Sequence, residues 1–181
     1  MIKHTFYFLC FSTKCFLLTF SISVIFIQTL KISQIITPTE ISVSTPSTLI
    51  NYKNNQVMNE IKKDLKTLGA PEKELESLSR SIKMASETTN INSKIITSLM
   101  YTESTFKKDV ISSKGYKGLM QTPEATFKFS EVDTLLGAKV LQEKLNISNG
   151  NLLEALTLYK GGNNNASRQY AKEVLQICEL L

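Results

Sequence analysis

Glu103 is the residue whose type and position best fit acid–base chemistry. It follows Leu99 by four positions and Ile95 by eight, so it lies on the apolar stripe of a predicted helix. Because that helix ends soon afterwards, we expect the carboxyl near the negative end of the helix dipole. Desolvation and the dipole both favour the protonated carboxyl, which is the form that a general acid needs near neutral pH. The alternative reading of these residues is a glutamate that reaches solvent or pairs with a lysine.

A loop with two glycines follows this candidate acid. Gly115 and Gly118 allow a tight turn that brings the backbone close to a ligand, and the pair Leu119 and Met120 can hold the loop against the core. Gln121 carries a donor and an acceptor suited to the hydroxyl or acetamido groups of a sugar. This segment therefore predicts one wall of a sugar-binding site.

A second apolar stripe lies further along the chain. Leu152 and Leu156 recur at helical spacing and lead to Tyr159, and Gly161 follows as a helix stop. A tyrosine at the end of such a stripe can bury its ring and direct its hydroxyl at a polar group. The alternative is a core tyrosine that is bonded to backbone.

The composition excludes several other chemistries. The single histidine, His4, lies at the extreme N-terminus, which excludes a catalytic triad or a histidine-bearing metal site in the body of the chain. Three cysteines provide neither a metal knuckle nor a disulfide framework. Of the net charge of +5, three lysines and no acidic residue fall in residues 1–31, so the remainder carries only +2. We therefore expect no metal, no cofactor and no nucleic-acid partner.

The first 31 residues read as an export segment. A short basic start precedes an almost uninterrupted apolar run over residues 6–30, and no clear small-residue cleavage site follows it. We predict a signal peptide or an uncleaved signal-anchor over 1–31, with the rest of the chain exported to the periplasm or cell envelope. If the segment is uncleaved, residues 6–30 anchor the chain in the inner membrane.

The remaining chain divides into a spacer and a helical body. Residues 32–54 are rich in Ser, Thr, Ile and Asn with little periodicity, which is typical of a flexible linker. From 55 to 181 the apolar residues recur at helical spacing, and Asn92 is a candidate N-cap. The expected helices cover about 57–68, 75–84, 93–103, 131–146, 151–160 and 164–181. Short helices without alternating strands predict a compact, orthogonal all-α fold.

Several of these residues together resemble a known family. The blocks are Glu103-Ser104-x-Phe106, Ser112, Gly115-x-x-Gly118-Leu119-Met120-Gln121 and Ala155-Leu156-x-x-Tyr159-x-Gly161-Gly162. Over about residues 72–180 they resemble the soluble lytic transglycosylase (SLT) domain. The resemblance implies a goose-type, lysozyme-like helical fold that cleaves bacterial peptidoglycan.

The resemblance also implies roles for single residues. Glu103 would be the catalytic acid and then the base, and the substrate contacts would fall on Ser112, Gln121, Tyr159, Gly118 and Met120. The chain differs from the family pattern at Tyr116, where a small residue is usual, and at Lys160, where asparagine is usual.

The implied activity is non-hydrolytic cleavage of the bond between N-acetylmuramic acid and N-acetylglucosamine, which leaves 1,6-anhydro ends. A hydrolytic muramidase stays open, because Asp109, Glu124 or Glu131 could supply a second carboxylate. A non-catalytic peptidoglycan-binding module is a further alternative. The expected partners are peptidoglycan glycan strands, the membrane through an uncleaved N-terminus, and an envelope-spanning machine of the kind such enzymes serve.

Overall fold

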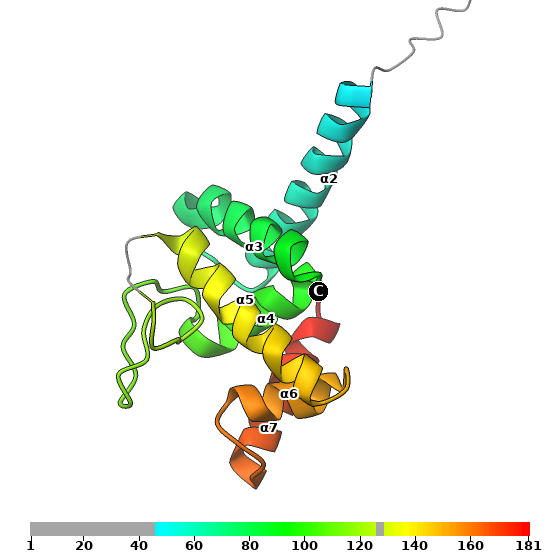
Figure 1. Ribbon diagram of the computed structural model, residues 1–181. Coiled ribbons are helices and arrows are strands. Elements are labelled where there is room, and N and C mark those ends of the chain that lie inside the picture. Colours follow the sequence, from blue (N-terminus) through cyan, green and yellow to red (C-terminus); the bar gives the residue numbers. More distant parts are fainter. Residues whose placement is uncertain (1–45, 126–128) are drawn as a thin grey trace, which may run out of the picture. The chain divides into compact units, whose positions relative to one another are not determined.

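Helices account for nearly all the regular structure in the part of the chain that the structure describes. The computed structural model describes residues 46–125 and 129–181 (Figure 1). The elements are α2 (Pro46–Thr67), η1 (Glu72–Glu74), α3 (Leu75–Thr89), α4 (Ser93–Ser104), α5 (Ser130–Ile147), α6 (Leu152–Tyr159) and α7 (Asn165–Glu179). Within these residues β-pairing is limited to isolated bridges in the loop after α4. The predicted all-α class is confirmed for this part of the chain.

Asparagine side chains define where three of these helices begin. The side chain of Asn92 accepts a hydrogen bond from the backbone N–H of Lys94, as the sequence predicted. Asn151 and Asn164 do the same at the starts of α6 and α7. An N-cap of this kind satisfies a backbone N–H that has no partner inside the helix. The capping residues therefore set the start of α4, and with it the register of the residues at its far end.

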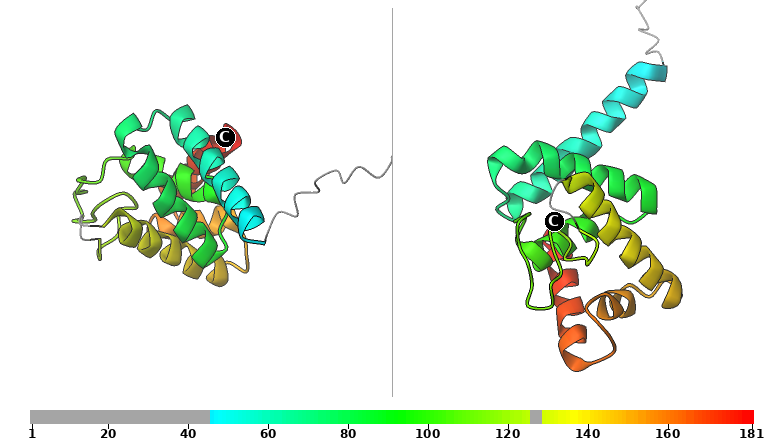
Figure 2. Two further views of the ribbon diagram at one scale, coloured as in Figure 1. Left: turned by 90° about the horizontal axis from the view of Figure 1, so that it is seen from above. Right: turned by 60° about the vertical axis from the view of Figure 1, so that its left-hand side comes forward.

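Helix α4 forms the centre of the domain. Its residues Ile96, Leu99 and Met100 are fully buried. Around it, α3 packs along α5, α6 packs against α5 and α7, and α7 packs against α4. The helices cross at steep angles rather than running side by side as an up-and-down bundle (Figures 1 and 2). This arrangement brings the C-terminal end of α4 to the junction of α6 and α7.

Helix α2 begins earlier than the sequence predicted. Residues 46–54, which the composition assigned to the flexible linker, form the first turns of α2. Residues Ile50 to Lys53 are exposed, so these turns have no apolar periodicity that a sequence pattern could reveal. Pro46 is well suited to the first turn of a helix, because its missing N–H would have no intrahelical partner there.

The predicted export segment, residues 1–31, lies outside the described residues, as do residues 32–45 of the predicted linker. Among the helices that the structure does describe, none has the length and apolar character needed to cross a membrane.

Candidate active site

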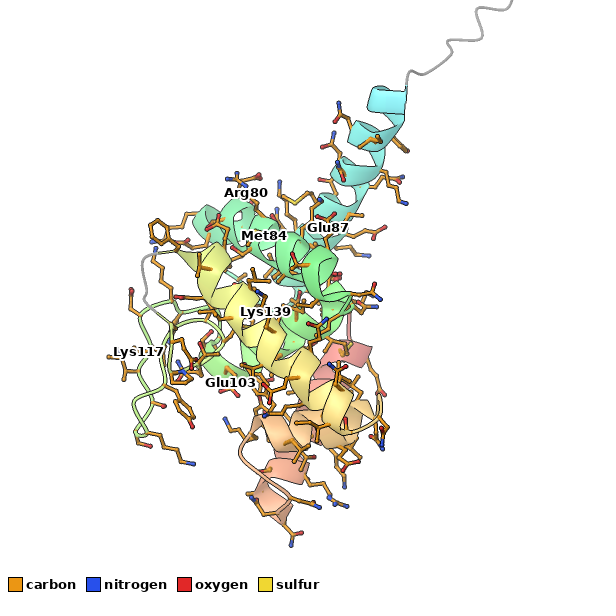
Figure 3. All side chains as sticks on the ribbon, viewed as in Figure 1. Arg80, Met84, Glu87, Glu103, Lys117 and Lys139 are labelled. Carbon is orange, nitrogen blue, oxygen red and sulfur yellow. The ribbon has the colours of Figure 1, made fainter. Side chains whose placement is uncertain are left out.

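Glu103 lies in the last turn of α4, and its side chain is only 7% exposed. The helix ends abruptly because Thr105 and Phe106 both adopt left-handed backbone conformations, with φ of 47° and 63°. Phe106 is thereby turned into the core, where its ring lies 5.6 Å from that of Tyr101. The strained turn places the Glu103 carboxylate at the end of α4, between the following loop and helices α6 and α7 (Figure 3).

The Glu103 carboxylate has two partners from distant parts of the chain. The hydroxyl of Tyr170, on α7, donates to Oε1 at 2.5 Å. The ammonium group of Lys160, at the end of α6, lies 3.3 Å from Oε1 and 3.2 Å from Oε2. The last turn of α4 carries no basic residue, so the cation that neutralises Glu103 comes from another helix. Glu103 is thus both buried, as predicted, and paired with a lysine, which was the alternative reading.

Two phenols flank this carboxylate. Burial raises the pKa of Tyr170, and the negative charge of Glu103 raises it further. Burial and then Glu103 likewise raise the pKa of Tyr159. Both hydroxyls therefore keep their protons throughout the physiological pH range and act as hydrogen-bond donors beside the carboxylate.

The loop after α4 forms the wall of the site opposite helices α6 and α7. The backbone N–H of Gly118 donates to Val110 at 3.0 Å, and Lys117 and Thr122 exchange two backbone hydrogen bonds at 3.1 Å. Gly118 has φ of +74°, and a Cβ there would lie 3.2 Å from Oδ2 of the buried Asp133. Only glycine accommodates both the left-handed conformation and this close approach.

Leu119 and Met120 hold the loop against the core, as predicted. Both side chains are buried, and Met120 packs against Gly137 in the middle of α5. The hydroxyl of Tyr159 donates to the backbone carbonyl of Met120 at 2.7 Å. Tyr159 therefore ties the end of α6 to the loop across the floor of the site.

Gln121 is only 8% exposed and adopts a left-handed conformation with φ of 50°. Its side-chain Nε2 donates to the carbonyls of Val110 at 3.1 Å and Gly118 at 2.9 Å, which holds this conformation in place. Because the amide nitrogen is occupied by the loop, the side-chain oxygen is the atom left to accept a hydrogen bond from a ligand.

A cavity of about 240 Å³ brings most of the predicted site residues together. Its lining is Glu103, Ser112, Ser113, Lys114, Tyr116, Gln121, Tyr159 and Lys160. Four of the predicted residues, Glu103, Ser112, Gln121 and Tyr159, are among these. Gly118 and Met120 are not, because they lie behind the wall and shape it.

The cavity lining contains a single carboxylate among the described residues, that of Glu103. Asp109 lines a separate cavity of about 380 Å³ instead, and neither Glu124 nor Glu131 belongs to either lining. Within residues 46–125 and 129–181, no group of three metal-ligating side chains lies close enough together to hold an ion.

Tyr170 is a site residue that the sequence pattern did not reveal. Tyr170 lies on the buried face of α7 with Ser167, Ala171 and Val174, so helical periodicity could have placed it in the interior. Nothing in the local pattern indicates that its partner is Glu103, which lies 67 residues earlier. From the sequence, Lys160 stands out only as a departure from the family pattern.

Comparison with known proteins identifies the domain family and a similar fold. A family model described as "Transglycosylase SLT domain" matches residues 80–174, which is more than half of the chain. Among solved structures, the X-ray structure of an inactive mutant of the lytic transglycosylase Slt from Pseudomonas aeruginosa is similar, with a TM-score of 0.51 and 17% sequence identity. The likeness covers 71% of this chain and 28% of that one, and at this identity it concerns the fold. No curated protein matches the chain.

Proposed function

The chain belongs to the transglycosylase SLT domain family, and on that premise we propose that it is a peptidoglycan lytic transglycosylase in which Glu103 is the acid and then the base. The observation that carries the proposal is a single buried carboxylate in a cavity whose described lining offers no second one. Most glycosidases need two carboxylates, and a site with one requires the substrate to supply the second group.

The reaction begins with protonated Glu103 donating to the glycosidic oxygen between N-acetylmuramic acid and N-acetylglucosamine. As that bond breaks, the N-acetyl group of the muramyl sugar stabilises the positive anomeric carbon. Glu103, now a carboxylate, removes the proton from the sugar's own C6 hydroxyl, whose oxygen closes a 1,6-anhydro ring. Glu103 ends protonated as it began, and no water is consumed. The intramolecular attack avoids the entropic cost of capturing a second molecule.

The neighbours of Glu103 orient this chemistry. Tyr170 donates to Oε1, which leaves Oε2 as the oxygen that exchanges a proton with the sugar. The side-chain oxygen of Gln121 is available to accept from a sugar hydroxyl or acetamido N–H. Ser112 is hydrogen-bonded to the backbone N–H of Tyr116, at 3.0 Å, so it shapes the wall in addition to lining the cavity.

The substrate class also bears on location. Peptidoglycan lies outside the cytoplasmic membrane, so the proposal requires export, for which the apolar run over residues 6–30 supplies the sequence feature. We therefore propose a periplasmic or envelope location, with glycan strands as the principal partner.

The substitution Glu103→Gln tests the assignment, because it keeps the shape of the side chain and removes the transferable proton. With the full chain and purified sacculi, we expect cleavage to fall by about 10²–10⁴-fold, the usual worth of a general acid–base group. The matched control is Glu179→Gln, an exposed glutamate at the end of α7 that should leave the rate unchanged. Wild-type cleavage by Glu103→Gln would refute the role of Glu103.

The product distinguishes the proposed reaction from hydrolysis. Mass spectrometry of the soluble fragments should show 1,6-anhydro ends. Reducing ends throughout would instead identify a muramidase, in which a water molecule takes the place of the C6 hydroxyl.

A further inference from the structure

The contact between Glu103 and Lys160 conflicts with the role of a general acid. A general acid must hold a proton when the substrate arrives, whereas a cation 3.2 Å from Oε2 stabilises the carboxylate. The Lys160 ammonium also lies 4.4 Å from the centre of the Tyr170 ring, so the same phenol contacts both members of the pair. Glu103, Lys160 and Tyr170 therefore each contact the other two.

We propose that Lys160 is a positioning residue that holds the Glu103 carboxyl in an ion pair in the free protein and must move away before Glu103 can act as an acid. This inference rests on the proposed function, because it specifies how that reaction is restrained. Because the ion pair is present in the free protein, its effect on Glu103 can be measured without any reaction taking place.

Lys160 is the mobile member of the pair. Its side chain is 43% exposed, whereas that of Glu103 is 7% exposed and is fixed on α4. The Lys160 ammonium contacts the side chains of Glu103 and Tyr170. Gly161 and Gly162 follow directly, with φ of 119° and 127°. A lysine has a flexible four-carbon stem, so its ammonium can leave Glu103 without any change in the helix.

The charge balance of the cavity indicates what would draw Lys160 away. The cavity lining carries two lysines, Lys114 and Lys160, against the one carboxylate of Glu103. Once Glu103 is protonated, both cations lack an acidic partner in this lining. A glycan strand whose substituents carry carboxylates, as peptidoglycan stem peptides do, would supply the replacement. Binding an anionic strand and protonating Glu103 are therefore linked events.

Other groups near Glu103 do not compete for this role. The ionisable side chains that face it or its partners are Tyr159 from α6, Tyr170 and Glu173 from α7, and Lys114 and Tyr116 from the loop. Burial raises the pKa of Tyr159 and Tyr170, so neither phenol changes its charge in the working range. Among the described residues, the ion pair of Glu103 is with Lys160 alone.

The first experiment follows the Glu103 carboxyl directly in the free, full chain. Carbon-13 NMR of glutamate carboxyls gives its titration, and the signal absent from Glu103→Gln assigns it. In Lys160→Asn we expect the titration midpoint to rise by about one pH unit, the lower end of the usual effect of an adjacent charge because Lys160 is partly exposed. Lys160→Arg should restore the wild-type midpoint, and Lys139→Asn, an exposed lysine of α5 outside the cavity, should not change it.

The second experiment measures sacculus cleavage against pH. In Lys160→Asn the fall in kcat/KM with rising pH should move upward by the same amount. At pH 7 this raises kcat/KM by as much as about tenfold. The loss of a contact between Lys160 and the anionic strand should offset part of this gain.

The outcomes separate the two hypotheses. An unchanged Glu103 titration in Lys160→Asn overturns the restraint by Lys160, whatever the activity. A wild-type chain that cleaves no glycan at any pH, with the titration shifted as expected, overturns the proposed function and leaves the ion pair intact.

Discussion

The contact between Gly137 and Met120 gives a sharp prediction for stability. A glycine-to-alanine substitution inside a helix normally stabilises a protein, but at Gly137 we expect it to destabilise. Gly137 lies in the middle of α5, where alanine normally stabilises a helix. A Cβ at Gly137 would lie 2.3 Å from Met120 Cβ, 2.7 Å from Cγ and 3.0 Å from Cε. The nearest atom is attached directly to the loop backbone, so rotating the methionine side chain does not relieve the clash.

The magnitude follows from three opposing contributions. Overpacking of a filled core costs about 1–3 kcal/mol. Alanine in place of glycine stabilises the helix by about 1 kcal/mol through its higher helix propensity. If the loop moves to make room, the hydrogen bond from Tyr159 to the Met120 carbonyl is lost, which costs about 1 kcal/mol. We expect Gly137→Ala to lower the free energy of unfolding by about 1–3 kcal/mol and to reduce glycan cleavage, since Gln121 moves with the loop.

Urea unfolding of the full chain, followed by circular dichroism, measures this effect. Position 139 provides a matched control, since Lys139 is exposed on the same helix. There, alanine should be more stable than glycine by about 1 kcal/mol, from propensity alone. If Gly137→Ala is as stable as the wild type or more stable, the packing argument for the loop is refuted.

Local signals predicted most of the fold. The Asn92 cap, the apolar stripe of α4 and the burial of Leu119 and Met120 each depend on a few neighbouring residues, and each is confirmed. The start of α2 was placed too late, because its first turns are exposed and leave no apolar pattern.

The partners of Glu103 could not be predicted in the same way. Periodicity shows which face of a helix is buried but not which polar group it meets. Tyr170 lies 67 residues and Lys160 57 residues from Glu103 in sequence. Their contacts depend on how α6 and α7 pack against the end of α4. The sequence therefore predicted the carboxyl and the loop beside it, but not its hydrogen-bond and ion-pair partners.

Two further predictions test these surroundings and the edge of the core. Tyr170→Phe keeps the buried ring but removes the donor that holds Oε1 of Glu103, so the carboxyl loses its fixed orientation toward the substrate. We expect kcat/KM on sacculi to fall about tenfold to a hundredfold; an unchanged kcat/KM would show that Tyr170 acts only in the core. Burial raises the pKa of Asp64, which is 5% exposed, and the nearby Lys94 offsets only part of that rise. A folded-state pKa above the unfolded value means that the ionised form costs stability at neutral pH, and that this cost disappears as the pH falls through the folded value toward 3.8. Asp64→Asn should therefore raise the thermal unfolding midpoint at pH 7, and this difference from the wild type should disappear near about pH 3.5. A lower midpoint at pH 7 would mean that the lysine neighbours stabilise the carboxylate more than burial destabilises it.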